Sequence, residues 1–502
     1  MTEWHSTVTP PALARLLRTA QAPAGPGHPV YRALARQVQL LLTDGRLPVG
    51  TRMPAERELA AALAVSRTTI AAAYDALRET GYLHSRRGSG SWTALPEGSR
   101  PPVDALFPVP PEGAGQVIDL GAATPPAPQP LFTEATARAV EQLPAYAQGH
   151  GHYPTGIPAL REAVADRFTQ RGLPTTPDQI LITSGAMSAL VLVFGALLRP
   201  GERVAVETPS YAHVLQALRN TGARLVPVPQ RRDDPCGMPR WDLTEWRQVM
   251  RGAAPRLAYV IPDFHNPTGA LIDEQQRRDL LAAARSAGTL VVVDETMAEL
   301  AWRDPALQLP RPTAGLDRAA QLITVGSASK LAWGGLRVGW VRAAPALIRQ
   351  LAAERLHHDH GTAVLEQLIC AHLLGERLPA LRELRLGQLR AGAEALLPAL
   401  RERLPQWRFA EPAGGITLWV DTGGLSGTAI ARAGERTGVR VAPGALFGLD
   451  GAFEGFVRLP LTVPPAAAAQ TVERLAATAE LAAREDGRGW AGTLGTAAAL
   501  AV

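Results

Sequence analysis

Lysine occurs once in this chain of 502 residues, at Lys330. Lysine and arginine together number 51, so the other 50 (51 − 1) are arginine. Arginine carries charge and binds phosphate at least as well as lysine, but it keeps its proton near neutral pH. A lysine with a lowered pKa becomes a nucleophilic amine, whose most demanding use is a Schiff base with a carbonyl. The alternative is an arginine-biased composition with one chance survivor, so the surroundings of Lys330 matter.

The residues around Lys330 suit an amine beside a phosphate. The lysine follows the apolar stretch 321–325 and a Gly-Ser-Ala-Ser turn, in which Ser327 and Ser329 supply hydroxyls. Arg337, which we expect to open the next strand, supplies a permanent positive charge. A lysine imine next to a phosphate clamp is what pyridoxal phosphate (PLP) needs, so we predict that Lys330 is the catalytic amine of a PLP site.

Three side chains at or beyond the ends of predicted strands suit the PLP ring. Asp294 ends the apolar run 290–293, and a carboxylate there lies in the crevice where α/β proteins bind ligands. It would keep the pyridine nitrogen protonated. Asn266, in the sequence HNPTG, would donate to the ring O3′, and Tyr211 would stack on the ring.

Two further groups suit the charged ends of a cofactor and its substrate. A strand-to-helix junction offers backbone N–H groups to a phosphate, and its residues are Ser184, Gly185, Ala186 and Met187. Arg458 would fork onto a substrate carboxylate. Each motif alone is open to a plainer interpretation, as a turn, a junction or a helix cap. Their order and spacing, with the only lysine among them, favour the cofactor site.

All of the net charge of +5 lies near the N-terminus. Residues 1–95 hold 11 arginines and 6 acidic residues, and the remainder holds 40 basic and 40 acidic residues. Helices are predicted at 29–43, from about residue 54, and at 67–80, followed by a two-stranded ribbon. Three helices and a basic hairpin predict a winged helix-turn-helix that binds double-stranded DNA. The alternative is a structural three-helix cap with solvated charges.

Short hydroxyls and arginines mark the predicted DNA contacts. At the start of the third helix, Ser66 is the expected N-cap, Thr68 and Thr69 suit phosphates, and Arg67 would fork onto guanine. The wing residues that would approach the backbone or minor groove are Arg86, Arg87, Gly88 and Gly90.

Residues 45–92 closely resemble the GntR-type DNA-binding domain. The resemblance implies DNA contacts at Arg57, at the residues from Ser66 to Thr69, and at the wing glycine. Some family members carry another arginine where this chain has Ala71, so that contact is expected to be absent.

The rest of the chain predicts a large α/β domain. Residues 1–27 are expected to form a flexible arm, 28–95 the DNA-binding domain, 96–116 a Pro/Gly-rich linker, and 485–502 a disordered tail. Between them, residues 117–484 alternate apolar strands with amphipathic helices, which predicts a largely parallel sheet covered on both faces. Candidate strands are 179–183, 203–207, 257–261, 289–294, 321–325 and 337–341.

This region resembles fold-type I aminotransferases, and with the GntR head the chain resembles MocR/GabR-type regulators. The resemblance implies a head-to-tail homodimer in which Tyr153 reaches the partner's PLP phosphate. Many relatives have a tyrosine that donates to O3′ two or three residues after the aspartate that binds the pyridine nitrogen. Here those positions are Thr296 and Met297, which leaves Asn266 as the main O3′ partner and puts efficient transamination in doubt.

Two functions remain open on the sequence. One is a PLP-dependent transcriptional regulator that senses PLP, an amine or an amino acid, and the other is an active aminotransferase with a DNA-binding appendage. Two cysteines exclude a disulfide framework and a cysteine-rich metal site. No signal peptide or membrane span is recognised, so we expect a cytoplasmic protein without a metal or a membrane partner. The effector, the operator and the direction of regulation are not encoded in any recognisable motif.

Overall fold

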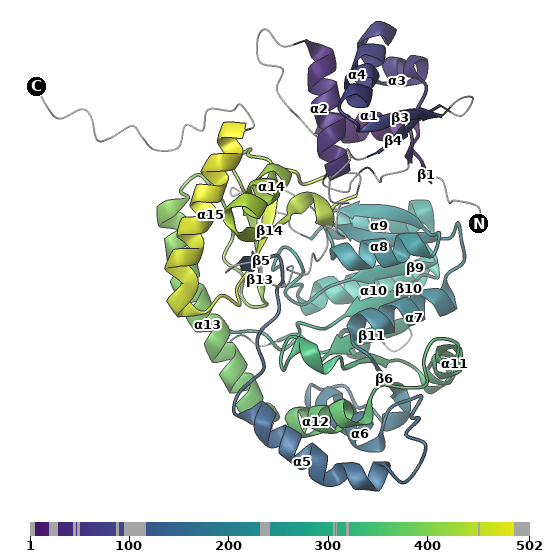
Figure 1. Cartoon of the computed structure of the whole chain (residues 1–502). Helices are drawn as coiled ribbons and strands as arrows, with labels where there is room; N and C mark the ends of the chain where they lie inside the picture. The colour runs from purple at the N-terminus through teal and green to yellow at the C-terminus, as the bar shows by residue number, and fades with distance from the viewer. Residues whose placement is uncertain are drawn as a thin grey trace, which may run out of the picture.

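The computed structural model of the chain describes residues 6–19, 29–43, 47, 51–86, 90–94, 117–230, 241–304, 307, 309–317, 321–449 and 452–485. Figure 1 shows a small N-terminal head (purple), an α/β part around a teal sheet, and a C-terminal part with the long helices α13 (Leu378–Arg403) and α15 (Pro465–Glu485). The expected linker, 96–116, and the expected tail beyond residue 485 lie outside the described residues. No helix within the described ranges is long and apolar enough to cross a membrane.

The head is a winged helix-turn-helix, as predicted. Its helices are α1 (Pro10–Thr19), α2 (Val30–Thr43), α3 (Glu56–Leu63) and α4 (Arg67–Glu79). Its sheet has the order β1-β2-β4-β3, with strands at Ser6–Thr7, Thr51–Arg52, Gly90–Thr93 and Leu83–Arg86. Strands β3 and β4 pair antiparallel and form the wing. Side chains from all four helices share one core, which makes the head a packed unit.

The segment expected to be a flexible arm, 1–27, contains the helix α1. Leu13 and Leu17 are buried, and α1 contacts both α2 and α3. The Ala- and Pro-rich composition suggested an unordered arm. Leucines four residues apart place one apolar face on a helix, and that face completes the head's core.

The central sheet has seven strands in the order β6-β12-β11-β10-β9-β7-β8. Their bounds are β6 (Ile180–Thr183), β7 (Arg203–Thr208), β8 (Arg224–Pro229), β9 (Leu257–Val260), β10 (Leu290–Asp294), β11 (Leu322–Ser327) and β12 (Gly339–Arg342). Strand β12 runs antiparallel to both its neighbours, and the other pairs are parallel. The prediction of a largely parallel sheet is confirmed, although it missed the edge strand β8.

Both faces of this sheet are covered, which explains why its strands read as continuous apolar runs. In β10, Val291 and Val293 pack with α9 (Leu243–Ala253) and α10 (Glu274–Ala287). Val292 packs on the other face, where α7 (Ala186–Leu197), α8 (Ala212–Asn220) and α11 (Pro345–Arg355) lie. Successive side chains of a strand alternate between the two faces of the sheet, so the last residue of each strand faces one defined side of the sheet.

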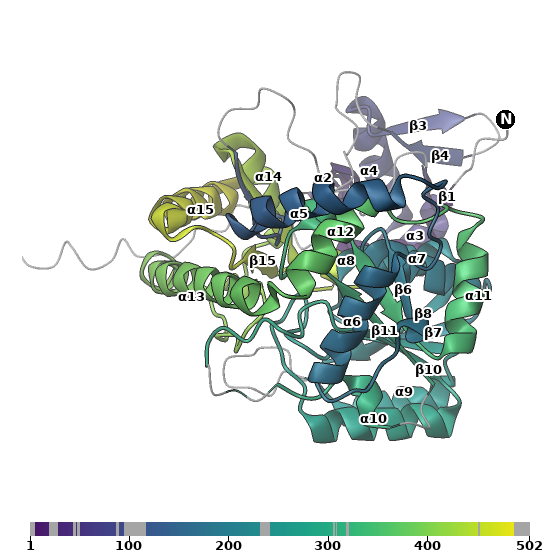
Figure 2. The same ribbon diagram turned by 90° about the horizontal axis from the view of Figure 1, so that it is seen from below.

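A second sheet belongs to the C-terminal part. Its order is β13-β15-β14-β5, with strands at Thr417–Asp421, Phe456–Pro460, Val439–Pro443 and Ile118–Leu120. Helix α14 (Gly427–Thr437) contacts α15 and β14, and α15 also contacts α13. Figure 2 shows α5 (Leu131–Tyr146), α6 (Pro158–Gln170) and α12 (Val364–Leu374) grouped together, and α12 contacts both others.

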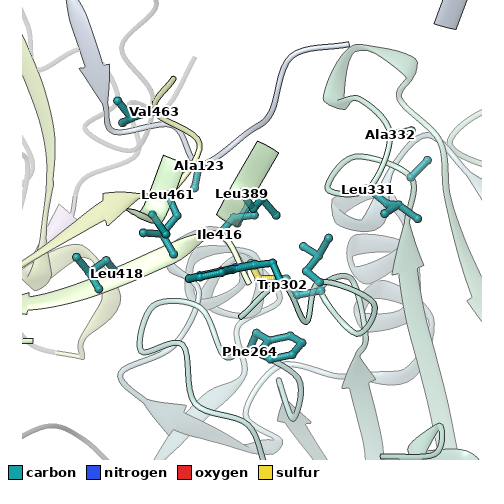
Figure 3. Packing of buried hydrophobic residues seen from close by; sticks show 14 of the residues in the cluster. Ala123, Phe264, Trp302, Leu331, Ala332, Leu389, Ile416, Leu418, Leu461 and Val463 are labelled. Atoms are coloured by element: carbon teal, nitrogen blue, oxygen red, sulfur yellow. The ribbon is translucent and has the colours of Figure 1, made fainter. Parts of the chain in front are cut away.

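The large hydrophobic core joins the turn after β11 to the C-terminal part. Figure 3 shows Leu331 and Ala332 in one cluster with Trp302, Ile416 and side chains from α13 and the strand ends of the second sheet. The indole N–H of Trp302 donates to the carbonyl of Gly415 at 2.8 Å. The two residues after Lys330 are therefore anchored in a core that both parts share.

A hydrogen bond between described residues also joins the head to the body. A guanidinium nitrogen of Arg36, in α2, donates to the carbonyl oxygen of Glu485 at 2.8 Å. Glu485 is the last residue of α15, and its carboxylate also pairs with Arg436 of α14.

Candidate PLP site and DNA interface

Lys330 lies in the turn that follows β11, with its amine turned into the protein. Its Nζ donates to the carbonyl of Ala123 at 2.9 Å. Burial, followed by the charge of Arg458, lowers the pKa of Lys330 to about 8, although Asp294 acts in the opposite direction. The surroundings thus favour the neutral, nucleophilic amine far more than water does.

Asp294 ends β10 and is held by two donors. The hydroxyl of Tyr259 donates to Oδ2 at 2.7 Å, and the backbone N–H of Thr296 donates to Oδ1 at 2.9 Å. Burial raises the pKa of Asp294, while these hydrogen bonds and Lys330 favour its ionised form. Tyr259 was missed by the sequence analysis. The available signal was a hydroxyl-bearing aromatic in the otherwise apolar strand β9.

The junction between β6 and α7 forms a small cradle with Arg337. A guanidinium nitrogen of Arg337 donates to the carbonyl of Ser184 at 3.0 Å. Gly185 has φ 98°, and a Cβ there would lie 2.6 Å from Arg337 Nη2, so glycine is required. Ala186 and Met187 form the first turn of α7, whose N–H groups favour an anion.

One sequence expectation about Arg337 is wrong. This residue does not open β12; it ends a short 3-10 turn in the left-handed conformation, φ 50°, two residues before Gly339. The glycines just before it permit that turn, which directs the guanidinium toward the start of α7. The serines before Lys330 bond to each other, with 2.8 Å between the Oγ atoms of Ser327 and Ser329.

Tyr211, Asn266 and Arg458 lie in three different parts of the fold. Tyr211 is the N-cap of α8, and burial raises its pKa to about 12 against the opposing charge of Arg458. Asn266 is buried in the segment that follows β9, and its Oδ1 has no hydrogen-bond partner. Arg458, in β15, donates to the carbonyl of Gly121, and its Nε has no partner. Burial lowers the pKa of Arg458 to about 10.

Thr296 and Met297, which stand where many relatives have a tyrosine, make contacts other than the expected one to O3′. The side chain and N–H of Thr296 bond to Asp294, and Met297 is buried in the core. Tyr153 packs edge-on against Tyr146, with 5.9 Å between ring centroids. Its reach to a partner subunit stays a prediction.

The structure therefore brings five predicted side chains into one electrostatic group: Lys330, Asp294, Tyr211, Arg337 and Arg458. They come from the end of β10, the turn after β11, the N-cap of α8, the middle of β15 and the turn before β12. An amine, a carboxylate and a cationic cradle meet in one place, and no two of them are close in sequence except Lys330 and Arg337.

The predicted DNA contacts outside the wing lie at the start of α4 and, for Arg57, in α3. The Oγ of Ser66 accepts the N–H of Thr69 at 3.1 Å, which confirms the N-cap. Arg67 is 74% exposed and pairs with Glu56 at 3.2 Å. Arg57 and Thr68 are also exposed, so this corner of the head presents hydroxyls and guanidinium groups to solvent.

Helix α4 and the wing are joined by a residue that the sequence analysis missed. Arg78 donates to Ser85 at 3.0 Å and to Ser91 at 2.9 Å, one serine on each wing strand. Gly90 begins β4 in the left-handed region, φ 94°. Arg87, Gly88 and the side chain of Arg86 lie outside the described residues.

Comparison with known proteins assigns both parts. Residues 116–477 match the model of aminotransferase class I and II, and residues 30–92 match that of bacterial regulatory proteins of the gntR family. The HTH-type transcriptional regulator TauR of Rhodobacter capsulatus is 30% identical, over 91% of this chain and 97% of that protein. The probable rhizopine catabolism regulatory protein MocR of Rhizobium meliloti is 28% identical, over 83% of this chain and 86% of that protein.

Among solved structures, the α-aminoadipate aminotransferase LysN of Thermus thermophilus, complexed with N-(5′-phosphopyridoxyl)-L-leucine, is similar with a TM-score of 0.66. It is 29% identical and covers 74% of this chain and 95% of that one. Fold and site thus define an aminotransferase-like PLP domain that carries a DNA-binding head. The chain belongs to the aminotransferase class I and II family and, with its GntR head, to the MocR-type regulators.

The residues present fit PLP. Lys330 would supply an amine for the aldehyde, Asp294 an anion for the pyridine nitrogen, and the cradle of Gly185 and Arg337 a place for the phosphate. The unpartnered Oδ1 of the buried Asn266 is a polar atom that a ligand would satisfy. When bound, PLP supplies an electron sink for the bonds of an attached amino acid.

Proposed function

We propose that this chain is a PLP-dependent, DNA-binding transcriptional regulator whose aminotransferase-like domain senses PLP, an amine or an amino acid. The observation that carries the proposal is the half-buried amine of Lys330, whose pKa of about 8 suits reversible reaction with a carbonyl, on the same chain as a winged head. Tyr259 and Thr296 hold Asp294 in place, and Arg337 orients the phosphate end.

An amino acid suits the effector role better than a plain amine because of Arg458. This side chain is buried, faces the group around Lys330, and keeps its Nε without a partner. A guanidinium with a free edge binds a carboxylate with two parallel hydrogen bonds. Lys330 and Arg458 together therefore suit a ligand with an amino group and a carboxylate.

The working unit is proposed to be a homodimer, head-to-tail, in the cytoplasm where its DNA lies. Tyr153 packs on Tyr146 in its own chain, and we propose that its hydroxyl serves the phosphate of the partner. Two heads on one body would then bind two half-sites whose spacing matches the heads.

Operator binding in three states tests the regulator. Protein without PLP, with PLP, and with PLP plus each member of a panel of amines and amino acids is titrated against operator DNA at fixed salt. Coupling of about 1–3 kcal/mol, or roughly 5- to 150-fold in affinity, is expected between at least two states. Equal affinity in all three would reject sensing. Steady-state transamination over common amino donors would then establish the alternative, an aminotransferase tethered to DNA.

The DNA role of α4 has its own test. Arg67→Ala should lose about 1–3 kcal/mol of preference for the operator over other sequences, because one bidentate base contact is removed. Arg57→Ala, the matched control, should weaken binding to all sequences alike and reduce the salt slope by about one. Unchanged operator preference in Arg67→Ala, measured by gel-shift competition, would show that α4 is not the reading helix.

A further inference from the structure

A cluster of buried charges lies on the opposite side of the central sheet from Asp294. Arg171 of α6 pairs with Glu295 at 3.2 Å, and Arg167 of α6 pairs with Glu299. Arg382 of α13 binds the second oxygen of Glu299. Glu295 follows Asp294 directly, so adjacent carboxylates serve two different sites.

In this cluster the carboxylate acceptors have hydrogen-bond partners, but several N–H donors do not. Both oxygens of Glu299 bind arginines, and those of Glu295 bind Arg171 and the N–H of Thr313, the latter at 2.8 Å. In contrast, four buried N–H donors have no partner: Arg167 Nε, Arg167 Nη1, Arg171 Nη2 and Trp340 Nε1. An unpaired buried donor costs about 1–3 kcal/mol, so four in one place require an explanation. The cluster therefore lacks a hydrogen-bond acceptor for these four donors.

The charges of the cluster also indicate that an anionic partner is missing. Three arginines face two glutamates, an excess of one positive charge. Burial on its own raises the pKa of Glu299, but Arg167, Arg382 and Arg171 outweigh it and hold that pKa at about 2. The Glu299 carboxylate is thus ionised at neutral pH, and the positive excess in a largely buried site favours a negative partner.

A small pocket lies beside the residues that carry these four donors. It is lined by Arg167, Arg171 and Trp340, by the arginine-paired carboxylates of Glu295 and Glu299, and by Val164, Phe168 and Gly326. The Arg167 guanidinium lies 5.1 Å from the centre of the Trp340 ring, and that ring occupies the space beside Gly326. A Cβ at Gly326 would lie 2.3 Å from Trp340 Nε1, so only glycine leaves the indole in this place.

We propose that this pocket binds a small monovalent anion of chloride size, held by Arg167, Arg171 and the indole N–H of Trp340. An anion accepts from every unpartnered donor and balances the excess charge. Water would accept at most two of these hydrogen bonds and would leave the charge unbalanced.

Thermal unfolding of the PLP-loaded full chain tests the site. Tm is measured in chloride and in gluconate, an anion too large for the pocket, at equal ionic strength. Wild type should show a chloride-specific rise of about 2 °C or more, since a ligand that binds only the folded state stabilises it. Arg171→Gln should lose the rise. The matched control is Arg161→Gln, which removes the same charge from the same helix but bonds to the carbonyls of Pro177 and Ile180 instead.

A second variant keeps the test open if Arg171→Gln fails to fold. Glu295→Gln retains an oxygen for the Thr313 N–H and adds to the positive excess, so the chloride concentration for half the rise should fall. Crystals soaked in bromide should show an anomalous peak between Arg167, Arg171 and Trp340. No bromide peak there, an equal Tm in chloride and gluconate, a full chloride response in Arg171→Gln, or an unchanged half-effect in Glu295→Gln would each overturn the anion site.

Discussion

At the scale of single residues, the surroundings of Lys330 shift its pKa in opposing directions. Burial and the positive charges of Arg458 and Arg337 lower its pKa, and Asp294 raises it, with a net value of about 8. An ordinary lysine amine, with a pKa near 10.4, is almost fully protonated at pH 7. At a pKa of about 8, roughly one molecule in ten carries the neutral amine at pH 7. Lys330 could therefore act as a nucleophile without a separate base.

This pKa predicts how PLP uptake depends on pH. The neutral form reacts, and the folded-state pKa is lowered, so the uptake rate should rise with pH up to about 8 and then level off. Arg458→Gln removes a positive charge and should move this midpoint upward. Arg408→Gln, an exposed arginine paired with Asp421, should leave it in place. The rate is followed by the visible absorbance of bound PLP, and a wild-type rate still climbing at pH 10 contradicts the assignment.

The sole lysine also permits a labelling test. Borohydride reduction of the PLP-loaded chain should fix one pyridoxyl group, on the only peptide that contains lysine. Lys330→Ala should carry no label in that peptide and lose the visible absorbance of the bound cofactor. Retention of that absorbance in Lys330→Ala would mean that another group holds PLP.

Tyr259 predicts a measurable effect on the cofactor through Asp294. Its hydroxyl stabilises the ionised carboxylate at 2.7 Å, and hydrogen bonds to charged groups are worth about 1.5–3 kcal/mol. Tyr259→Phe should therefore raise the pKa of Asp294 and weaken PLP binding by about tenfold or more. Tyr82→Phe, in the head, is the matched control and should bind PLP as wild type does. Equal PLP affinity in both variants, by equilibrium titration, would mean that Tyr259 only packs.

At the scale of elements, the start of α4 combines two tasks. Ser66 caps the helix through the Thr69 N–H, and the same exposed turn is the predicted contact with DNA phosphates. Arg78 ties α4 to both strands of the wing. These hydrogen bonds fix α4 relative to both wing strands, so we expect the helix and the wing to be positioned together on DNA.

Substitutions at Ser66 should separate these two tasks. Ser66→Ala removes the cap, which costs about 1 kcal/mol, so the first-turn amides of α4 should exchange hydrogen roughly fivefold faster. Ser66→Asp keeps a capping oxygen and the slow exchange, but its charge repels phosphate and should weaken DNA binding. Hydrogen exchange and gel shift on the full chain measure the two effects. Slow exchange in Ser66→Ala would show that the helix does not depend on this cap.

At the scale of the whole molecule, the predicted dimer divides each PLP site between two chains. Lys330 and Asp294 come from one chain, and Tyr153 is proposed to come from the other. The head contacts its own body at Arg36 and Glu485, beside the ion pair of Glu485 with Arg436. This contact places the end of α15 against α2, so we expect a shift of α15 to be felt by the head.

Mixed dimers test the shared site. Lys330→Ala chains lack the amine, and Tyr153→Ala chains should hold PLP weakly because each lacks the partner's hydroxyl. A dimer with one chain of each kind has one complete site, so tight PLP binding should return at one site per dimer. Unmixed dimers are the control, and titration with PLP measures both. No recovery on mixing, with heterodimers shown by native mass spectrometry, would place Tyr153 in its own chain's site.

Much of this protein was determined by local sequence. The cap at Ser66, the apolar runs of the buried strands and the solitary Lys330 depend on residues within a few positions of one another. Backbone hydrogen bonding and side-chain alternation act over that range, so the strands β6, β7, β9, β10 and β11 were predicted within two residues. The motifs of the PLP site were recognisable because each follows such an element.

The tertiary structure alone decided which of these residues meet. Tyr259 reaches Asp294 because β9 and β10 are neighbours in the sheet, although 35 residues separate them. The antiparallel direction of β12, the packing of α1 into the head and the four unpartnered donors around Trp340 likewise have no local signature. Sheet order and packing bring distant residues together, and they follow from the burial of the whole chain rather than from any short segment of it.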